Sequence, residues 1–236
     1  MDNTANLQLP LVQASQAQKH VTVNEALLRL DAASQLVLQQ TGVTTPPAGA
    51  EDGACFGIGT GAMGAWAGQD GKVAVADNGG WSFLVPQSGW RAWDVAGARG
   101  VLRLGLDWVP EGVSRAGSGA GARFVTVEAL HDIVPGPNNV TAVTIPARVT
   151  LFAASARVVS AISGTANTWQ LGEAGATDRF GSGLGLGAGS YADGLLSQPQ
   201  AYYTDSALVV TGEGGDLAEG QIRIALHYLA YTLPGL

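Results

Sequence analysis

The second half of the chain carries side chains of the kinds that bind sugars. The ring of a tryptophan or tyrosine packs against the apolar C–H face of a sugar, and planar polar side chains bond the sugar hydroxyls in pairs. On that ground we expect carbohydrate contacts from Trp169, Asp178, Arg179, Tyr191, Tyr202 and Tyr203. The alternative is structural: Trp169 would belong to a core, and Asp178 and Arg179 would form an ion pair at the start of a strand.

A second aromatic group lies between residues 63 and 108, where five of the six tryptophans occur. A sheet so rich in glycine has little else to fill a core, so Trp81 and Trp93 are expected to be buried. The other three lie beside turn signals and are expected to be exposed. With polar residues of the N-terminal segment they form the candidate assembly surface, which comprises Gln16, Lys19, His20, Trp66, Trp90 and Trp108.

Patterns for catalysis, metals or cofactors are weak in this sequence. The run GLGLGA at residues 183–188 matches a glycine-rich dinucleotide pattern, but no apolar strand precedes it and no helix follows. The three histidines are scattered, His131-Asp132 is followed closely by Pro135, and no G-x-S-x-G motif occurs. We therefore expect no enzyme activity, no metal and no cofactor. A carboxylate pair for glycoside hydrolysis stays open, because the fold and not the sequence sets its spacing.

The composition favours a β protein that covers part of its surface with copies of itself. The 34 glycines and only 13% charged residues suit short strands joined by tight turns. A net charge of −7 offers no basic face for nucleic acid, and no apolar run approaches the ~18 residues that suggest a membrane span. The N-terminus lacks the basic and apolar regions of a signal peptide, so we expect synthesis in the cytoplasm without export. The single cysteine, Cys55, excludes an internal disulfide framework.

Residues 1–110 predict one helix followed by a small sheet. Thr22 and Glu25 have the spacing of a capping box, helix formers follow, and Gly42 supplies a stop, which together predict a helix over residues 23–40. Turn signals then separate short apolar segments. These predict an antiparallel β-meander with strands at residues 63–67, 72–76, 81–85, 90–95, 101–104 and 106–109.

A glycine- and serine-rich segment, residues 111–121, is predicted to link this module to a second one at residues 122–236. The second module reads as strand after strand. In the last strand Ile222, Ile224, Leu226 and Tyr228 alternate with Arg223, Ala225 and His227. Glycines at every second position from 181 to 189 predict a strand with one bare face. The fold class is therefore mainly β, with an N-terminal helix and meander followed by a jelly-roll-like β-sandwich.

Two motifs in the first module carry a resemblance to a known family. The run QAQKHVTVNEAL at residues 16–27, with the later GAWAG, GW and AW motifs, resembles a domain of unassigned function found in alphaproteobacterial prophages and gene transfer agents. The similar region spans roughly residues 4–108. The resemblance implies a component of the head spikes, which help such particles adsorb to the capsular polysaccharide of recipient cells. The second half is similar to C-terminal β modules of phage tail and fibre proteins, but no long coiled coil or β-helix separates the two modules, which favours a compact spike subunit.

These observations lead to an expectation for the whole chain: a structural and adsorption protein on the surface of a virion-like particle. Its second module would bind host surface polysaccharide. Its partners would be capsid or other spike proteins and further copies of itself, as a homotrimer, because spikes are usually three-fold and a sparsely charged β-sandwich has surface to cover. Two alternatives are a capsule-depolymerising glycoside hydrolase and a purely structural virion subunit.

Overall fold

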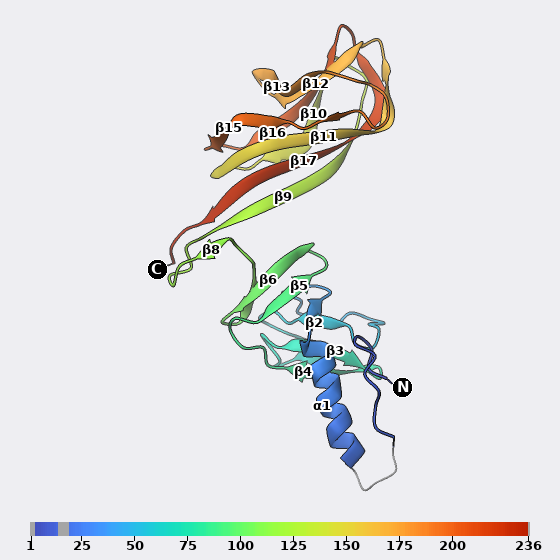
Figure 1. The fold of residues 1–236 in the computed structure, drawn as a ribbon, viewed down its shortest axis with the longest axis vertical. Helices are drawn as coiled ribbons and strands as arrows, with labels where there is room; N and C mark the ends of the chain where they lie inside the picture. Colours follow the sequence, from blue (N-terminus) through green and yellow to red (C-terminus); the bar gives the residue numbers. More distant parts are fainter. Residues whose placement is uncertain (1–2, 14–18, 236) are drawn as a thin grey trace. The chain divides into compact units, whose positions relative to one another are not determined.

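The computed structural model describes residues 3–13 and 19–235, and it is mainly β (Figure 1). The chain divides into two compact units, residues 1–111 and residues 112–236. We call them unit 1 and unit 2. The division falls next to the predicted end of the first module at residue 110.

Unit 1 contains the helix α1 (Lys19–Ala33), and the predicted helix over residues 23–40 is wrong at both ends. Thr22 lies inside α1 and not in front of it, so it cannot cap the first turn. The helix ends before Gln35, whose backbone is left-handed with φ 53°. A strand follows at once, and Gly42 lies beyond it.

Seven strands within the described part of unit 1 form one sheet, in the order β4-β3-β2-β1-β5-β6-β7. Their bounds are β1 (Val37–Leu38), β2 (Cys55–Gly57), β3 (Val73–Asp77), β4 (Gly80–Leu84), β5 (Arg91–Asp94), β6 (Arg99–Leu104) and β7 (Asp107–Pro110). The sheet is not the purely antiparallel meander that the sequence predicts, because β1 runs parallel to both β2 and β5. Residues 63–67 are not a strand either, since they contain the 3-10 helix η1 (Gly64–Trp66).

Both faces of this sheet are covered by apolar side chains. Neighbouring residues of a strand point to opposite faces, and along β2 and β3 they alternate between two clusters. Cys55, Val73 and Val75 pack in a cluster with Ala32 of α1, whereas Phe56 and Ala74 pack with Trp66 in the other. Unit 1 therefore has an interior on each side of a small sheet.

The segment predicted as a linker, residues 111–121, belongs largely to unit 2. The strand β8 (Ser114–Arg115) pairs with the start of β9 (Gly121–Asp132), and a tight turn joins them. The glycines and serines of this segment thus serve a hairpin turn and not a free linker.

Unit 2 continues with antiparallel strands, all of them six residues or longer except the two-residue β14. They are β10 (Asn138–Ile145), β11 (Val149–Gly164), β12 (Thr168–Glu173), β13 (Ala176–Leu184), β14 (Tyr191–Ala192), β15 (Leu195–Tyr202), β16 (Ser206–Glu213) and β17 (Leu217–Thr232). The predicted strand with a bare glycine face is wrong, because β13 ends at Leu184 and the glycines after it lie in a loop and a turn.

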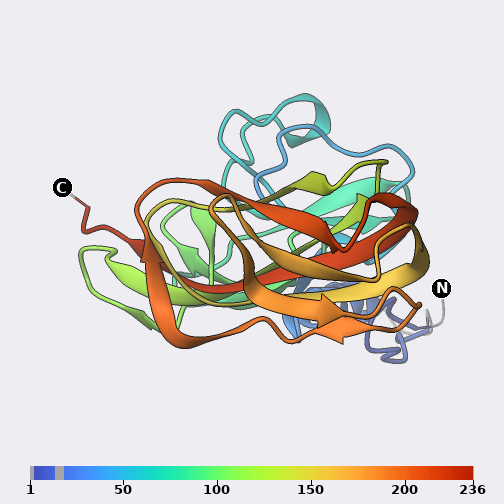
Figure 2. The ribbon, with the colours of Figure 1, turned by 90° about the horizontal axis from the view of Figure 1, so that it is seen from above.

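The strands of unit 2 pair from the outside of the sequence inward. β9 pairs with β17, β10 with β16, β11 with β15, and β12 with β13. This is a long antiparallel ribbon rolled up so that β17 also pairs with β11 and β16 with β12. The result is a four-stranded sheet, β10-β16-β12-β13, and a six-stranded sheet, in which β14 and β15 both lie along β11. Figure 2 shows the long strands β11 and β17 side by side. The arrangement is a jelly roll, as the sequence predicts.

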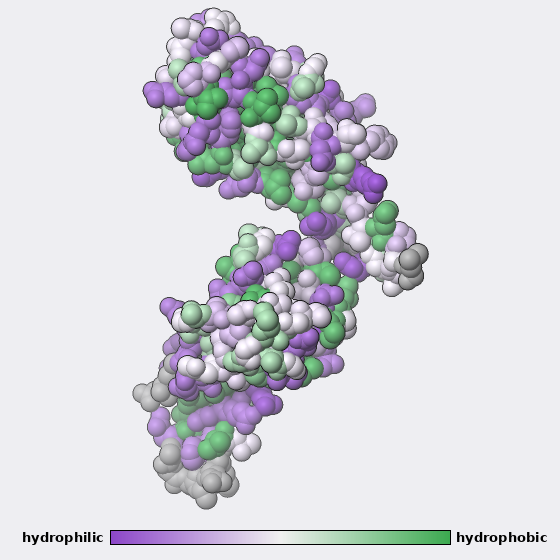
Figure 3. All heavy atoms as spheres, turned by 180° about the vertical axis from the view of Figure 1, so that it is seen from behind, coloured by the Kyte–Doolittle hydropathy of each residue, from purple (hydrophilic) through white to green (hydrophobic). Residues whose placement is uncertain are grey.

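The core of unit 2 lies between its two sheets. In β17, Ile222, Ile224 and Leu226 are fully buried in this core, as their alternation predicts, and Arg223 and Ala225 lie on the outer face. On the face of the molecule shown in Figure 3, apolar side chains are dispersed among polar ones and form no single continuous patch. A candidate site is therefore better sought in the hollows of the surface.

Candidate functional site

Trp169 is not a sugar platform, and its assignment from the sequence is wrong. The side chain is fully buried in the core of unit 2, and its Nε1 donates a hydrogen bond to the carbonyl oxygen of Gly185 at 2.9 Å. The structural alternative, a core tryptophan, is correct.

Tyr202 and Arg179 belong to an internal polar network around Glu173. The Tyr202 hydroxyl donates to Glu173 Oε1 at 3.0 Å, and Ser206 donates to Oε2 at 2.6 Å. Arg179 Nε lies 2.8 Å from Glu173 Oε1, so the ion-pair partner of Arg179 is Glu173 and not Asp178. Burial, with the hydrogen bond to Glu173, raises the pKa of Tyr202 to about 12. The ring of Tyr202 is buried and unavailable for stacking.

The remaining predicted sugar contacts lie in three separate places. Asp178 is exposed on β13, in the four-stranded sheet. Tyr203 is 84% exposed just after β15 and lines a hollow of about 810 Å³ with Tyr231 and Leu233. Tyr191 is 58% exposed on β14, in the six-stranded sheet. The fold thus does not bring the predicted set together.

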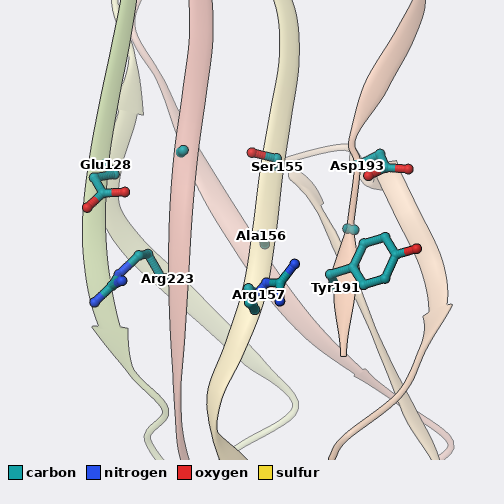
Figure 4. Close-up of a pocket in the computed structure, with 9 residues that line it drawn as sticks. Glu128, Ser155, Ala156, Arg157, Tyr191, Asp193 and Arg223 are labelled. Atoms are coloured by element: carbon teal, nitrogen blue, oxygen red, sulfur yellow. The ribbon is translucent and has the colours of Figure 1, made fainter. Parts of the chain in front are cut away.

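Tyr191 lines a different hollow, of about 320 Å³, on the outer face of the six-stranded sheet (Figure 4). We call it the charged hollow. It is built by four adjacent strands, β9, β17, β11 and β14, with the residue after β14 at its edge. Its lining consists of Glu128, Ser155, Ala156, Arg157, Tyr191, Ala192, Asp193, Arg223 and Ala225.

The strand register arranges these side chains in two rows. Arg157 pairs with Arg223 on one side and with Tyr191 on the other, which makes a basic and aromatic row across the sheet. Two residues further along the strands, Ser155 pairs with Ala225, which in turn pairs with Glu128. Figure 4 shows Glu128, Ser155 and Asp193 in this second, acidic row.

The first row places an aromatic ring beside a cation. Arg157 Cζ lies 5.7 Å from the centroid of the Tyr191 ring, within the range of a cation–π contact. This contact restricts both side chains while the ring stays more than half exposed. The row can therefore offer an oriented platform and a planar hydrogen-bond donor to the same ligand.

His227 lies next to the acidic row and contacts side chains of the two strands that flank its own. Its Nε2 lies 2.9 Å from Ser155 Oγ, and its Nδ1 lies 3.3 Å from Thr126 Oγ1. The imidazole thereby joins β11, β17 and β9 on the outer face. Ser155 is held by this contact at the edge of the charged hollow.

The sequence alone does not single out any of the four charged residues that line the hollow: Glu128, Arg157, Asp193 and Arg223. The alternation along residues 222–228 does place Arg223 on the outer face of its strand. The alternation does not show which strand lies beside β17, nor the register that places Arg157 of β11 opposite Arg223. Both depend on pairing between segments that are distant in the sequence.

In unit 1 the structure corrects the predicted assembly tryptophans. Trp66 is fully buried, with its ring centroid 4.9 Å from that of Trp81 and 5.9 Å from that of Phe56. It is part of a core, so its assignment to an exposed interface is wrong. Trp90 and Trp108 are half-buried and pack against the cluster beneath α1.

Trp93 is the reverse case. It is expected in the core, but 49% of it is exposed, and it lines a hollow of about 550 Å³ beside Val37 and the ion pair between Arg91 and Glu111. The expectation that Trp93 is buried is wrong. This hollow is the best aromatic contact surface that we find on unit 1.

The predicted polar contacts of the N-terminal segment are only partly described. Gln16 lies outside the described residues. Lys19 is the first residue of α1, and His20 follows it, half-buried. His20 does not line the hollow beside Trp93.

The single cysteine of the chain, Cys55, is buried. Burial, with a smaller effect of the Asp31 charge, raises the pKa of the Cys55 thiol to about 12. Among residues 3–13 and 19–235, no three His, Cys, Asp or Glu side chains are grouped so as to hold a metal ion. The same residues include no helix of the length and apolarity needed to cross a membrane.

Comparison with known proteins gives a family for part of unit 1. Residues 23–109 match a family model described as "Protein of unknown function (DUF2793)". The match agrees with the resemblance of residues 4–108 to a domain of unassigned function, and it covers less than half of the chain. No curated protein matches the chain.

Among solved structures, one chain of "Cyanophage Pam1 capsid asymmetric unit" aligns with 52% of this chain and 94% of its own length. It is 15% identical, with a TM-score of 0.35. A likeness at this level does not establish a shared fold.

Proposed function

We propose that the chain is a non-catalytic adsorption protein, a spike subunit of a phage-like particle. Unit 1 would attach it to capsid or other spike proteins at the particle surface. Unit 2 would bind a polysaccharide of the host cell surface in the charged hollow. The resemblance of residues 4–108 to a prophage and gene transfer agent domain supports the particle, and the chemistry of the hollow supports the glycan.

The observation that carries the glycan part is the lining of the charged hollow. Tyr191 offers an exposed ring face, and Arg157 lies against it at 5.7 Å. Ser155, Glu128 and Asp193 add hydroxyl and carboxylate groups around that platform. An aromatic face with several convergent polar groups is the usual composition of a site for a polar small ligand such as a sugar.

The proposal predicts that Tyr191→Ala weakens glycan binding about tenfold, the equivalent of ~1.4 kcal/mol. The ring would no longer pack on the sugar and would no longer orient Arg157. The measurement is retention of the full chain on immobilised capsular polysaccharides and on a glycan array.

Tyr203→Ala is the matched control, because it removes a more exposed tyrosine from a different hollow of the same unit. It should leave binding unchanged. Loss of binding with Tyr203→Ala but not with Tyr191→Ala would move the site to that other hollow. Absence of binding by the wild-type chain to every glycan would favour the purely structural alternative.

A depolymerase is the second candidate, because Glu128 and Asp193 both line the charged hollow. Glycoside hydrolases use two carboxyl groups on either side of the scissile bond. Release of reducing ends from purified capsule, abolished by Glu128→Gln, would establish this activity. Our proposal expects no release.

We propose further that the working form is a homotrimer, with Trp93 at a contact of unit 1. Exposed tryptophans are frequent at the energetic centres of protein interfaces, and Trp93 lies beside the exposed Val37. Light scattering at micromolar concentration tests the oligomeric state. A monomer that also fails to bind particle proteins would contradict this part of the proposal.

A further inference from the structure

Arg157 and Arg223 lie directly opposite one another on the outer face of unit 2. β11 and β17 pair antiparallel with these two residues in register, and both side chains line the charged hollow. Like charges directly opposite on neighbouring strands destabilise a sheet. The pair therefore has a cost in the free protein.

No ion pair within the described residues compensates this cost, and the carboxylates of the hollow, Glu128 and Asp193, lie in the next row. Within residues 3–13 and 19–235, neither guanidinium takes part in an ion pair. The Tyr191 ring orients Arg157 but carries no charge. In Figure 4 the two guanidinium groups lean to opposite sides, Arg157 towards Tyr191 and Arg223 towards β9. Two facing arginines without a counterion from the protein are suited to bind an anion from solution.

We infer that Arg157 and Arg223 bind the carboxylate of an acidic sugar, so that the polysaccharide recognised by unit 2 contains uronic acids. The inference rests on the proposed function and names the class of glycan. A guanidinium group is planar and meets a carboxylate through two parallel N–H···O bonds, a geometry that a hydroxyl group cannot supply.

The acidic row can accept hydrogen bonds from the hydroxyl groups of the same sugar. It lies two residues along the strands from the arginines, about 7 Å at ~3.4 Å per residue. Carboxylates only accept hydrogen bonds, so Glu128 and Asp193 select hydroxyl donors, which a uronic acid carries on the ring edge away from its carboxylate. The same carboxylates repel additional negative charge, which favours a sugar with one carboxylate over a phosphomonoester or a densely sulfated sugar such as that of dextran sulfate.

The test compares each of several acidic polymers with the same polymer after its carboxylates have been removed by reduction. The full chain is titrated by calorimetry with polygalacturonate, alginate and hyaluronan, and with each polymer after its carboxyl groups have been reduced to alcohols. Dextran serves as the neutral comparison polymer, and dextran sulfate serves as the sulfated one. We expect the best carboxylated polymer to bind at least tenfold more tightly than its reduced form, and more tightly than dextran sulfate.

Variants assign the effect to the two arginines. Arg157→Gln and Arg223→Gln should each weaken binding of that polymer about tenfold. Arg115→Gln is the control, because Arg115 is an exposed arginine of the same sheet on β8, outside the hollow. Equal binding of native and reduced polymers, preference for dextran sulfate, or full binding by both hollow variants would overturn the inference and leave the proposed function intact. Failure of every polysaccharide to bind would overturn both.

A measurement without ligand tests the same pair independently. Because the facing charges repel, Arg223→Gln should melt at the same temperature as the wild type or at a higher one. A clear decrease would show that the arginine pair stabilises the sheet, and it would overturn the interpretation of the pair as a vacant anion site.

Discussion

Asp31 attaches the N-terminal segment of unit 1 to helix α1. Its buried carboxylate accepts hydrogen bonds from Thr4 Oγ1 at 2.6 Å and from the backbone N–H groups of Leu7 and Asn6 at 2.6 and 3.0 Å. Burial by itself raises the pKa of a carboxyl group. Here the hydrogen bonds, which favour the charged form, together outweigh burial, and the pKa of Asp31 is lowered.

Asp31→Asn should therefore destabilise unit 1 at neutral pH, by roughly 1–3 kcal/mol. The folded-state pKa lies below the unfolded value of about 3.9. The contribution of the charge is therefore complete above that value and is lost as the pH falls through the folded pKa. Urea unfolding followed by tryptophan fluorescence reports mainly on unit 1, which holds five of the six tryptophans.

The difference in unfolding free energy between wild type and Asp31→Asn should shrink as the pH falls below the unfolded pKa of about 3.9 and through the lower folded pKa. Glu51→Gln, which neutralises an exposed acid of the same unit, should show no comparable effect at either pH. A difference for Asp31→Asn that stays constant down to pH 2 would contradict a role for the charge.

The burial of individual tryptophans could not be predicted from the sequence. Trp66 and Trp93 both follow an alanine in a glycine-rich stretch, yet one is fully buried and the other half exposed. The 3-10 turn η1 carries Trp66 beneath Trp81, and the parallel strand β1 leaves Trp93 on an open face. Neither feature has a local sequence signal, so residue type alone sorts these tryptophans wrongly.

At the scale of elements, Gly194 sets the edge of the charged hollow. It joins β14 to β15 with a left-handed backbone, φ 60°, and a Cβ there would lie 1.8 Å from the carbonyl oxygen of Ala154. The carbonyl of Gly194 accepts a hydrogen bond from Ala154 N at 3.1 Å. Only glycine allows this approach of the β14–β15 junction to β11, which places Tyr191 and Asp193 beside Arg157 and Ser155.

Gly194→Ala should displace that junction and lower both stability and glycan binding. Left-handed strain and overpacking each cost about 1–3 kcal/mol. Gly175→Ala is the matched control, since Gly175 is also left-handed at φ 87° but has no atom within 4 Å of a Cβ. It should lose stability through strain alone and keep full binding. Melting temperature and polysaccharide titration separate the two effects, and normal binding by Gly194→Ala would contradict the positioning role.

Elements differ in how far the sequence predicts them. The strict alternation of residues 222–228 predicts β17, its buried face and its outward Arg223, all of which the structure confirms. The sequence pattern does not predict residues 176–180 of β13 or most of β15, because polar residues, and in β15 also Pro199, interrupt their apolar pattern. The charged hollow needs four strands in register, and that register is a property of the rolled ribbon and not of any one strand.

At the scale of the whole molecule, each unit is complete in its secondary structure. Every strand of unit 2 finds its partners among β8 to β17, and the two sheets enclose one core of their own. The seven strands in the described part of unit 1 likewise pair among themselves and have an interior on each face. An anchoring role and a glycan-binding role can thus be carried by separate units of one chain.

This division predicts that residues 112–236 alone fold and bind the same polysaccharide as the full chain. The cut between Glu111 and Gly112 leaves all four strands that build the charged hollow with their neighbours. Residues 1–111 alone should fold, bind no glycan, and retain association with particle proteins. Circular dichroism checks folding, and the polymer titration and a pull-down with particle proteins check the two activities. A folded unit 2 that binds no polysaccharide would contradict this division of roles between the two units.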